Sequence, residues 1–269
     1  MKKLWQQFTR YLRIYKMILI QDIKTKKVFR IDFIISFFSG IILGFANFIA
    51  IWVLFQNISS IMKWNYQEML FLYGFSLLSQ TPSSVFLDNS WLLCEKIIKG
   101  DFIIYCFRPI NIFFYYTFER INLNDIGQFF LGLVLIVYSW IKLKLSLTFL
   151  SYLKLFILLV VSSLFMVSIT VLVSAMSFWV FNAKGLRDFF LKFKDYSKYP
   201  FTAFGTVLKT IFSFIIPVAF IAYYPSLFFV HKEDLSWTSF FGIFYGIGLF
   251  YCSYKIWMKG AKQYSGTGT

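Results

Sequence analysis

The chain has 269 residues, of which 59% are hydrophobic and only 14% are charged, and its mean hydropathy is +0.68. On a soluble fold this composition would leave large apolar patches in contact with water, so it excludes an ordinary soluble domain and indicates a protein embedded in lipid. A formal net charge of +15 would suggest nucleic-acid binding in a soluble chain, so the placement of the charges must decide their meaning.

Six apolar stretches of 16 to 27 residues, each free of Asp, Glu, Lys, Arg and His, take up most of the chain. At 1.5 Å per residue, an α-helix of about 20 residues crosses a hydrocarbon core about 30 Å thick. The sequence therefore predicts an all-α integral membrane protein in which residues 31–269 form one transmembrane domain of six helices. The predicted spans are 34–55, 69–86, 126–141, 155–181, 211–230 and 237–254.

The Lys and Arg residues gather on one side of these spans. With the N-terminus placed in the cytoplasm, 22 of the 27 fall in the predicted cytoplasmic segments, so the positive-inside rule predicts that both termini are cytoplasmic. We expect this basic surface to attract anionic membrane lipids, and we expect no nucleic-acid partner. The predicted cytoplasmic segments are 1–33, 87–125, 182–210 and 255–269.

Residues 1–30 predict an amphipathic helix that lies on the inner membrane surface. Its aromatic face is expected in the headgroup boundary, and basic side chains point mostly elsewhere. The helix either anchors the N-terminus or takes part in gating, and the sequence leaves both roles open. The apolar positions at helical spacing are Leu4, Phe8, Tyr11, Tyr15 and Ile18.

Two predicted spans carry glycines four residues apart, a spacing that lets two helix backbones approach closely. The first span contains Gly40 and Gly44, and the last contains Gly242 and Gly246. Because any bundle of several helices needs close crossings, we favour packing within one chain over contact between two chains.

The second span ends in a polar run that contains Gln80, Thr81 and Pro82. Polar groups at membrane depth need internal partners or water, so this run fits the lining of a transport pathway. It fits equally well the inner boundary of the membrane, where Pro82 would break the helix. Pro217 predicts a kinked or re-entrant segment in the fifth span and is a second pathway candidate.

The longest predicted cytoplasmic connection, residues 87–125, is expected to carry function because long ordered loops often do. Residues 91–99 have amphipathic spacing and predict a short helix, which Gly100 would end as a C-cap before Asp101. Arg108–Pro109 would end one helical segment and begin the next. The second long connection, 182–210, alternates basic and aromatic side chains and is predicted to be interfacial.

No motif for nucleotide binding or for common hydrolytic chemistry is present. The chain contains no G-x-x-x-x-G-K-[ST], no H-E-x-x-H and no G-x-S-x-G, and Cys94, Cys106 and Cys252 lack the spacing of metal ligands. His231 is expected in a solvated loop rather than in a proton relay. We therefore expect no catalytic residue, metal site or cofactor in this chain.

The six predicted spans contain no ionisable Asp, Glu, Lys, Arg or His. Secondary transporters usually bury such a group near the midplane of the membrane, where it binds the coupling ion. The absence of such a group favours an external source of energy for transport.

Several short motifs together resemble one family. Residues 97–110 are similar to a loop signature with an isoleucine, a glycine and a later Arg-Pro pair, and residues 198–200, 216–225 and 257–266 are similar to a bacterial branch. The family is that of the ABC-2-type permeases, the membrane subunits of bacterial ABC exporters. The resemblance covers nearly the whole chain, including the interfacial helix and the six spans.

The resemblance implies that the connection 87–125 carries a coupling helix for a separate ATPase. Trp91 and Ile97 or Ile98 would be buried in a groove of that subunit, and Glu95 and Lys96 would lie at its rim. Gly100, Asp101, Arg108 and Pro109 would belong to the same coupling region.

The resemblance also implies partners and a location. ATP and Mg²⁺ would be bound by the ATPase, and a second permease, more often an unlike chain than a second copy, would complete the pathway in the bacterial cytoplasmic membrane. The expected activity is export of a hydrophobic or amphipathic compound, and the short outer loop 230–237 argues against polysaccharide. A stand-alone channel or secondary carrier and an integral-membrane enzyme stay open as alternatives.

Overall fold

The computed structural model describes residues 2–28, 30–123, 125–145, 148–180, 183–230 and 236–264. These residues fold almost entirely into helices, and no strand forms among them, which confirms the predicted all-α class. Predictions that concern residue 29, 124, 146–147, 181–182, 231–235 or 265–269 lie outside the described part of the chain.

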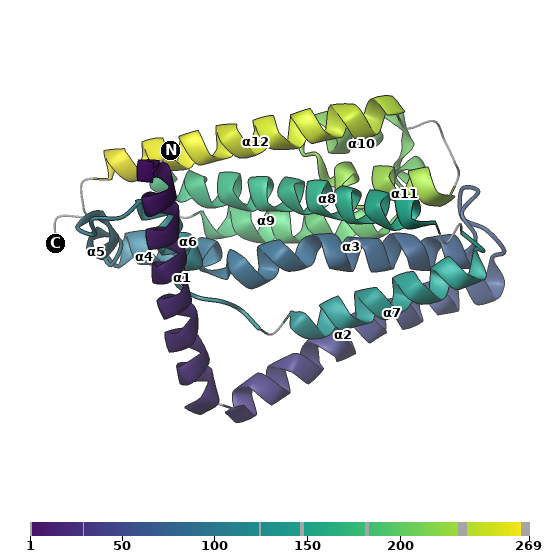
Figure 1. Cartoon of the computed structure of the whole chain (residues 1–269). Coiled ribbons are helices and arrows are strands. Elements are labelled where there is room, and N and C mark those ends of the chain that lie inside the picture. Colours follow the sequence, from purple (N-terminus) through teal and green to yellow (C-terminus); the bar gives the residue numbers. More distant parts are fainter. Residues whose placement is uncertain are drawn as a thin grey trace.

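Five long helices run roughly side by side and form the body of the molecule (Figure 1). α3 packs against α7 and α8, and α12 packs along α8, so α3 and α8 lie at the centre. Among the described residues, α2 and the segment Phe149–Phe178 are long and apolar enough to cross a membrane. The five helices are α2 (Arg30–Asn57), α3 (Tyr66–Phe86), α7 (Ile126–Lys142), α8 (Phe149–Ala175) and α12 (Ser236–Gln263).

Glycines set the closest helix crossings. A Cβ atom added to Gly132 of α7 would lie 3.1 Å from the carbonyl oxygen of Gly74 in α3, so the two backbones pass with no room for a side chain. Gly44 faces Leu131, and Gly246 faces the ring of Phe165. Gly44 and Gly246 therefore serve packing within one chain, as we favoured from the sequence. The crossing of α3 with α7 uses single glycines that no spacing had marked.

α1 (Lys2–Val28) runs across one end of the bundle, at a steep angle to the long helices (Figure 1). Its aromatic face does not lie wholly in the lipid boundary as predicted. Tyr11 packs edge-on against Phe114, and Tyr15 packs against Phe118, both in α6 (Ile112–Phe118). The aromatic residues of α1 thus hold the helix on the protein, while apolar side chains such as Leu12 and Met17 stay exposed.

The predicted interfacial connection 182–210 is corrected by the structure. α9 (Lys184–Lys194) packs along the side of α8, and the 3₁₀ turn Asp195–Lys198 packs against α3 (Figure 1). The side chains of Phe190 and Phe201 are buried, and Ser197 is completely covered. The error has a simple cause, because the lysines of this segment interrupt the apolar run from which a span would be recognised.

The predicted fifth span, 211–230, is broken rather than continuous. A helical stretch made of α10 (Gly205–Thr210) and a π-helical turn (Ile211–Ile215) ends at Ile216 and Pro217, and the chain then reverses into α11 (Tyr223–Val230). Pro217 lines a hollow with residues of α8 and α9. The predicted kinked or re-entrant character of this segment is confirmed, and the prediction of one span over 211–230 is wrong.

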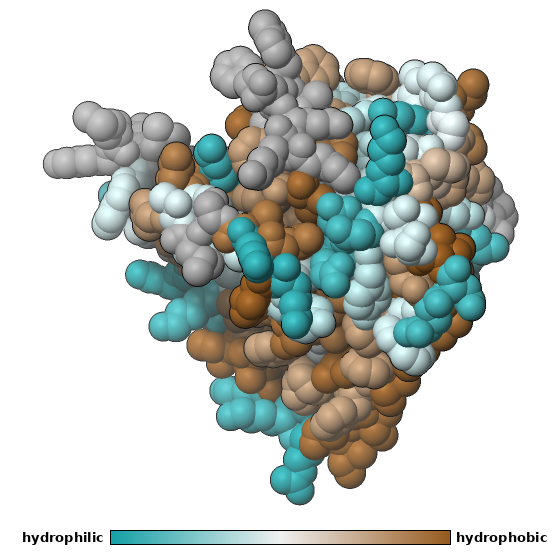
Figure 2. All heavy atoms as spheres, turned by 90° about the vertical axis from the view of Figure 1, so that its right-hand side faces the viewer, coloured by the Kyte–Doolittle hydropathy of each residue, from teal (hydrophilic) through white to brown (hydrophobic). Residues whose placement is uncertain are grey.

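The two ends of the bundle differ in what they carry. The start of α1, the end of α12 and the short helices between α3 and α7 lie at one end (Figure 1). The connection 58–65 and residues 143–145 lie at the other end. Figure 2 looks onto this second end, where hydrophilic side chains form a band and apolar side chains cover much of the surface below it.

The clustering of Lys and Arg residues at the α1 end of the bundle leads to a topology prediction. A reporter fused after Gln56 is expected outside the cell and a reporter fused after Lys99 inside, because most Lys and Arg residues gather at the α1 end. Lys192 is a poor fusion site because it lies within α9, and Lys232 lies outside the described residues. Alkaline phosphatase and green fluorescent protein fusions measure the two sides, and exchanged signals would overturn this orientation.

Candidate functional site

The connection between α3 and α7 folds into a small helical assembly at the α1 end of the bundle. The predicted helix 91–99 is divided in the structure, because Asp88–Leu92 form a 3₁₀ turn and α4 covers Leu93–Ile98. Gly100 ends α4 with a φ of 75°, a left-handed conformation that glycine adopts at no steric cost, so the predicted C-cap is confirmed. α5 (Ile103–Cys106) follows, and Arg108–Pro109 separates it from α6 as predicted.

A compact aromatic core supports this assembly from below. Trp257 of α12 is fully buried, and its ring lies 5.1 Å from Phe113, 5.4 Å from Phe178 and 6.1 Å from Phe102 between ring centroids. A Cβ atom at Gly260 would collide with Phe178, so α12 approaches the end of α8 closely here. The core therefore joins α5 and α6 to the ends of α8 and α12.

Trp91 points into the protein rather than toward a free surface. Its ring stacks on Phe190 of α9 at 6.0 Å between centroids, and its carbonyl oxygen accepts a hydrogen bond from Arg187. Glu95 pairs with Lys184, also in α9, at 3.2 Å. The Lys184 hydrogen bond and charge lower the pKa of Glu95. The predicted coupling residues Trp91 and Glu95 thus connect α4 to α9.

The other predicted coupling residues have mixed surroundings. Ile97 packs against the aromatic core, and Ile98 is exposed. Lys96 pairs with Asp101 at 3.8 Å across the turn that contains Gly100. Arg108 lies over the ring of Tyr115 at 5.3 Å, and Pro109 beside it is exposed.

Three apolar side chains project from this end and were not singled out from the sequence. Ile103, Ile104 and Phe107 follow one another at helical spacing on α5 and just beyond it, and we call them the apolar ridge. Phe107 is 80% exposed and Ile104 is 55% exposed. Phe107 follows Ile103 by four residues and Ile104 by three, and this helical spacing next to an Arg-Pro pair could have indicated the ridge.

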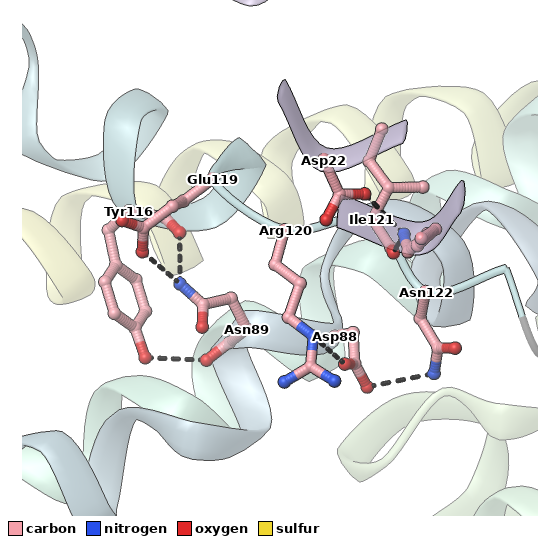
Figure 3. A network of polar contacts seen from close by, with 9 residues as sticks. Asp22, Asp88, Asn89, Tyr116, Glu119, Arg120, Ile121 and Asn122 are labelled. Atoms are coloured by element: carbon pink, nitrogen blue, oxygen red, sulfur yellow. Dashed lines mark hydrogen bonds and ion pairs between the residues drawn. The ribbon is translucent and has the colours of Figure 1, made fainter. Parts of the chain in front are cut away.

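A polar network fixes the base of the assembly (Figure 3). The side-chain amide of Asn89 donates to the carbonyl oxygen of Tyr116 at 2.6 Å, and the Tyr116 hydroxyl donates back to the carbonyl oxygen of Asn89 at 2.6 Å. The Tyr105 hydroxyl donates to the carboxylate of Glu119 at 2.5 Å. Burial raises the pKa of Tyr105 and that of Tyr116, so both hydroxyls stay protonated donors.

The same network reaches α1. Asp88 pairs with Arg120 at 3.9 Å and accepts a hydrogen bond from Asn122 at 3.2 Å, yet its burial still raises its pKa. Lys26 of α1 donates both to Asp22 and to the carbonyl oxygen of Ile121 (Figure 3). The last turns of α1 are therefore hydrogen-bonded to the connection between α6 and α7.

Three of the predicted pathway residues, Gln80, Thr81 and Pro82, lie in α3, and the fourth, Pro217, follows the π-helical turn. Gln80 is partly exposed and donates to the hydroxyls of Ser76 and Ser197, at 2.8 and 2.9 Å. Pro82 does not end α3, which continues to Phe86, so the reading of Pro82 as a helix break is wrong.

The remaining two candidates are Thr81, within α3, and Pro217, at a break between two helical segments. The Thr81 hydroxyl donates to the carbonyl oxygen of Leu77, a contact within α3. Pro217 is buried at the break after the π-helical turn. Of the four candidates, Gln80 is the one that joins α3 to the segment after α9.

Lys198 is a residue that the sequence reasoning missed. It is half-buried, and its ammonium donates to the side-chain oxygen of Asn47 in α2 at 2.6 Å. The six predicted spans contain no ionisable group, and Lys198 reaches α2 from a segment predicted to lie outside them. His231 lies outside the described residues.

Comparison with known proteins identifies the family. The family described as ABC-2 family transporter protein matches residues 41–268, which include the bundle from the middle of α2 onward and the α4–α6 assembly but not α1. No curated protein and no solved structure gives a match. Because the match covers most of the chain, this protein belongs to the ABC-2 transporter family.

Proposed function

We propose that this chain is the permease subunit of an ABC exporter whose ATP is bound and hydrolysed, with Mg²⁺, by a separate subunit. The observation that carries the proposal is the family match over residues 41–268 of a chain that has no phosphate-binding loop motif. Membership in the family makes the chain the permease component of an ABC transporter. The direction of transport and the use of ATP are parts of the proposal.

The α4–α6 assembly is the proposed docking site of the ATPase. Exposure of a Phe side chain and neighbouring Ile side chains to water at the end of the bundle is energetically unfavourable. Binding of a partner would bury them, and a few such buried side chains usually supply most of the binding energy of an interface. We assign this role to the apolar ridge. Lys96, Ile98, Asp101 and Arg108 would contact the rim, where charges contribute less.

Three connections would carry the ATPase movement into the membrane. The aromatic core around Trp257 joins the docking assembly to α8 and α12, and Lys26 joins it to α1. Trp91 and Glu95 would pass the same movement to α9. In this arrangement Trp91 transmits force within the permease, whereas the sequence placed it in the groove of the ATPase.

A second permease is the remaining proposed partner. Lys192 of α9 and Asp195 of the 3₁₀ turn after it are exposed beside apolar helices, and lipid is a poor environment for these charges. A partner chain and a polar pathway would cover this face in the cytoplasmic membrane. An unlike permease is preferred, as the resemblance of the sequence motifs implies, and the compound exported would be hydrophobic or amphipathic.

A secondary carrier is the second candidate function, and Lys198 is the observation that favours it, because carriers use ionisable groups at depth.

The first test separates this chain from its ATPase. The purified chain is expected to hydrolyse no ATP, and hydrolysis is expected when the nucleotide-binding subunit is added. Phosphate release measured in detergent and in lipid gives the result. Hydrolysis by the purified chain above that of a mock preparation would contradict the proposal.

A further inference from the structure

We propose that Lys198 binds the anionic headgroup of the transported compound, so that the substrates of this permease are anionic amphiphiles. The inference rests on the proposed export function and adds the chemical class of the substrate. Three features of Lys198 carry it: its depth in the bundle, its neutral partners, and its access from the surface.

The depth follows from the neighbours of Lys198. The hydroxyl of Ser197 lies 2.7 Å from the hydroxyl of Ser76, and Ser76 is ten residues from each end of α3. At 1.5 Å per residue, this position is about 15 Å from either end of the helix. Asn47, which accepts the hydrogen bond from Lys198, also lies well inside α2. The ammonium group is therefore near the middle of the bundle.

The partners of Lys198 are neutral. Its ammonium contacts the amide oxygen of Asn47 and lies 5.5 Å from the centroid of the Tyr199 ring. Among the described residues, no carboxylate forms an ion pair with it. An ionised side chain at the centre of a membrane is energetically unfavourable, so such groups normally face an opposite charge or water. The charge of Asp195, three residues earlier in the same 3₁₀ turn, attracts the ammonium of Lys198, but the two groups form no ion pair, and the ammonium stays available to an anion.

The surroundings of Lys198 suit an amphiphile. The residue is only half-buried, so part of its side chain is open to the surface of the bundle. Gln80 offers an amide nearby through Ser197, and Tyr196, which is 40% exposed, offers an aromatic face. A phosphate or carboxylate would form a charge-assisted hydrogen bond with Lys198, and its apolar chain would lie on the aromatic and aliphatic surface.

A carboxylate of the second permease could neutralise Lys198 instead of a substrate. That arrangement would make Lys198 an assembly residue, and its loss would prevent the two permeases from associating. The experiment therefore measures assembly as well as ligand preference.

The test compares two fluorescent probes that share one alkyl chain and one fluorophore, an alkyl phosphate and the corresponding neutral alcohol. Binding to the detergent-purified complex is measured without nucleotide, and stimulation of ATP hydrolysis is measured separately. The wild type is expected to prefer the phosphate. Lys198→Gln should reduce that preference about tenfold, the effect of one hydrogen bond to a charged group, and Lys198→Arg should keep most of it.

The control is Lys255→Gln, because Lys255 also lies over a tyrosine ring, that of Tyr251 at 5.3 Å, but on α12. This variant is expected to keep the full preference. A Lys198→Gln complex that assembles and still prefers the phosphate would overturn the inference, and so would failure of that variant to bind the second permease. Because binding needs no nucleotide, absent ATP hydrolysis would count against the proposed function alone.

Discussion

Alanine at both Ile104 and Phe107 is expected to weaken binding of the ATPase subunit by about 2–4 kcal/mol, the range of interface anchors. These side chains of the apolar ridge project from the α1 end and are mostly exposed, so their loss should leave the permease folded. Affinity is measured by titrating purified ATPase onto the permease in lipid nanodiscs, with ATP hydrolysis as a second readout.

The matched control for the apolar ridge is Phe149→Ala. Phe149 is also 80% exposed, but it begins α8 at the opposite end of the bundle. This variant is expected to bind the ATPase like the wild type. If the double alanine variant folds and binds with unchanged affinity, the ATPase docks elsewhere and the assignment of the apolar ridge is wrong.

Trp257→Ala is expected to destabilise the docking end by about 3–5 kcal/mol, the usual cost of removing a fully enclosed tryptophan. The substitution empties the centre of the aromatic core, which holds Phe102, Phe113 and Phe178 together. Thermal unfolding in detergent, followed by size-exclusion chromatography, measures the loss. Coupling of ATP hydrolysis to transport should fall with it, because α5 and α6 would no longer be fixed to α12.

Trp52→Ala is the control for this effect, since Trp52 is a tryptophan of α2 with 48% of its surface exposed. It is expected to change the unfolding temperature little. Trp257→Phe should recover part of the stability, because a smaller ring still fills much of the space. Equal stability of the Trp257→Ala and Trp52→Ala proteins would show that the core does not support the docking end.

The long apolar runs of the sequence were sufficient to predict α2, α3, α7, α8 and α12, because a run of about 20 apolar residues has one common solution in lipid. The segment 184–204 could not be predicted in this way. Lys192 and Lys194 break its apolar pattern, and only packing against α3 and α8 places it along the side of the bundle. The same packing brings Lys198 to depth.

The candidate site shows where an amphipathic pattern stops being informative. The spacing of residues 91–99 correctly indicated a helix ending at Gly100, but it could not tell which partner covers the apolar face. In the structure α9 covers Trp91, and the apolar ridge is left uncovered. Local sequence predicts turns and caps well, whereas the identity of a contact partner depends on segments far away in the chain.

The central claim is that transport by this chain is driven by ATP hydrolysed in a separate subunit. Its most direct test is a proteoliposome assay in which the permeases are reconstituted with and without the ATPase, and movement of the fluorescent alkyl phosphate is followed. We predict movement only with the ATPase and hydrolysable ATP, and none under a proton or sodium gradient alone. Movement of the probe by the permease under an ion gradient, without the ATPase, would contradict the claim and identify a secondary carrier.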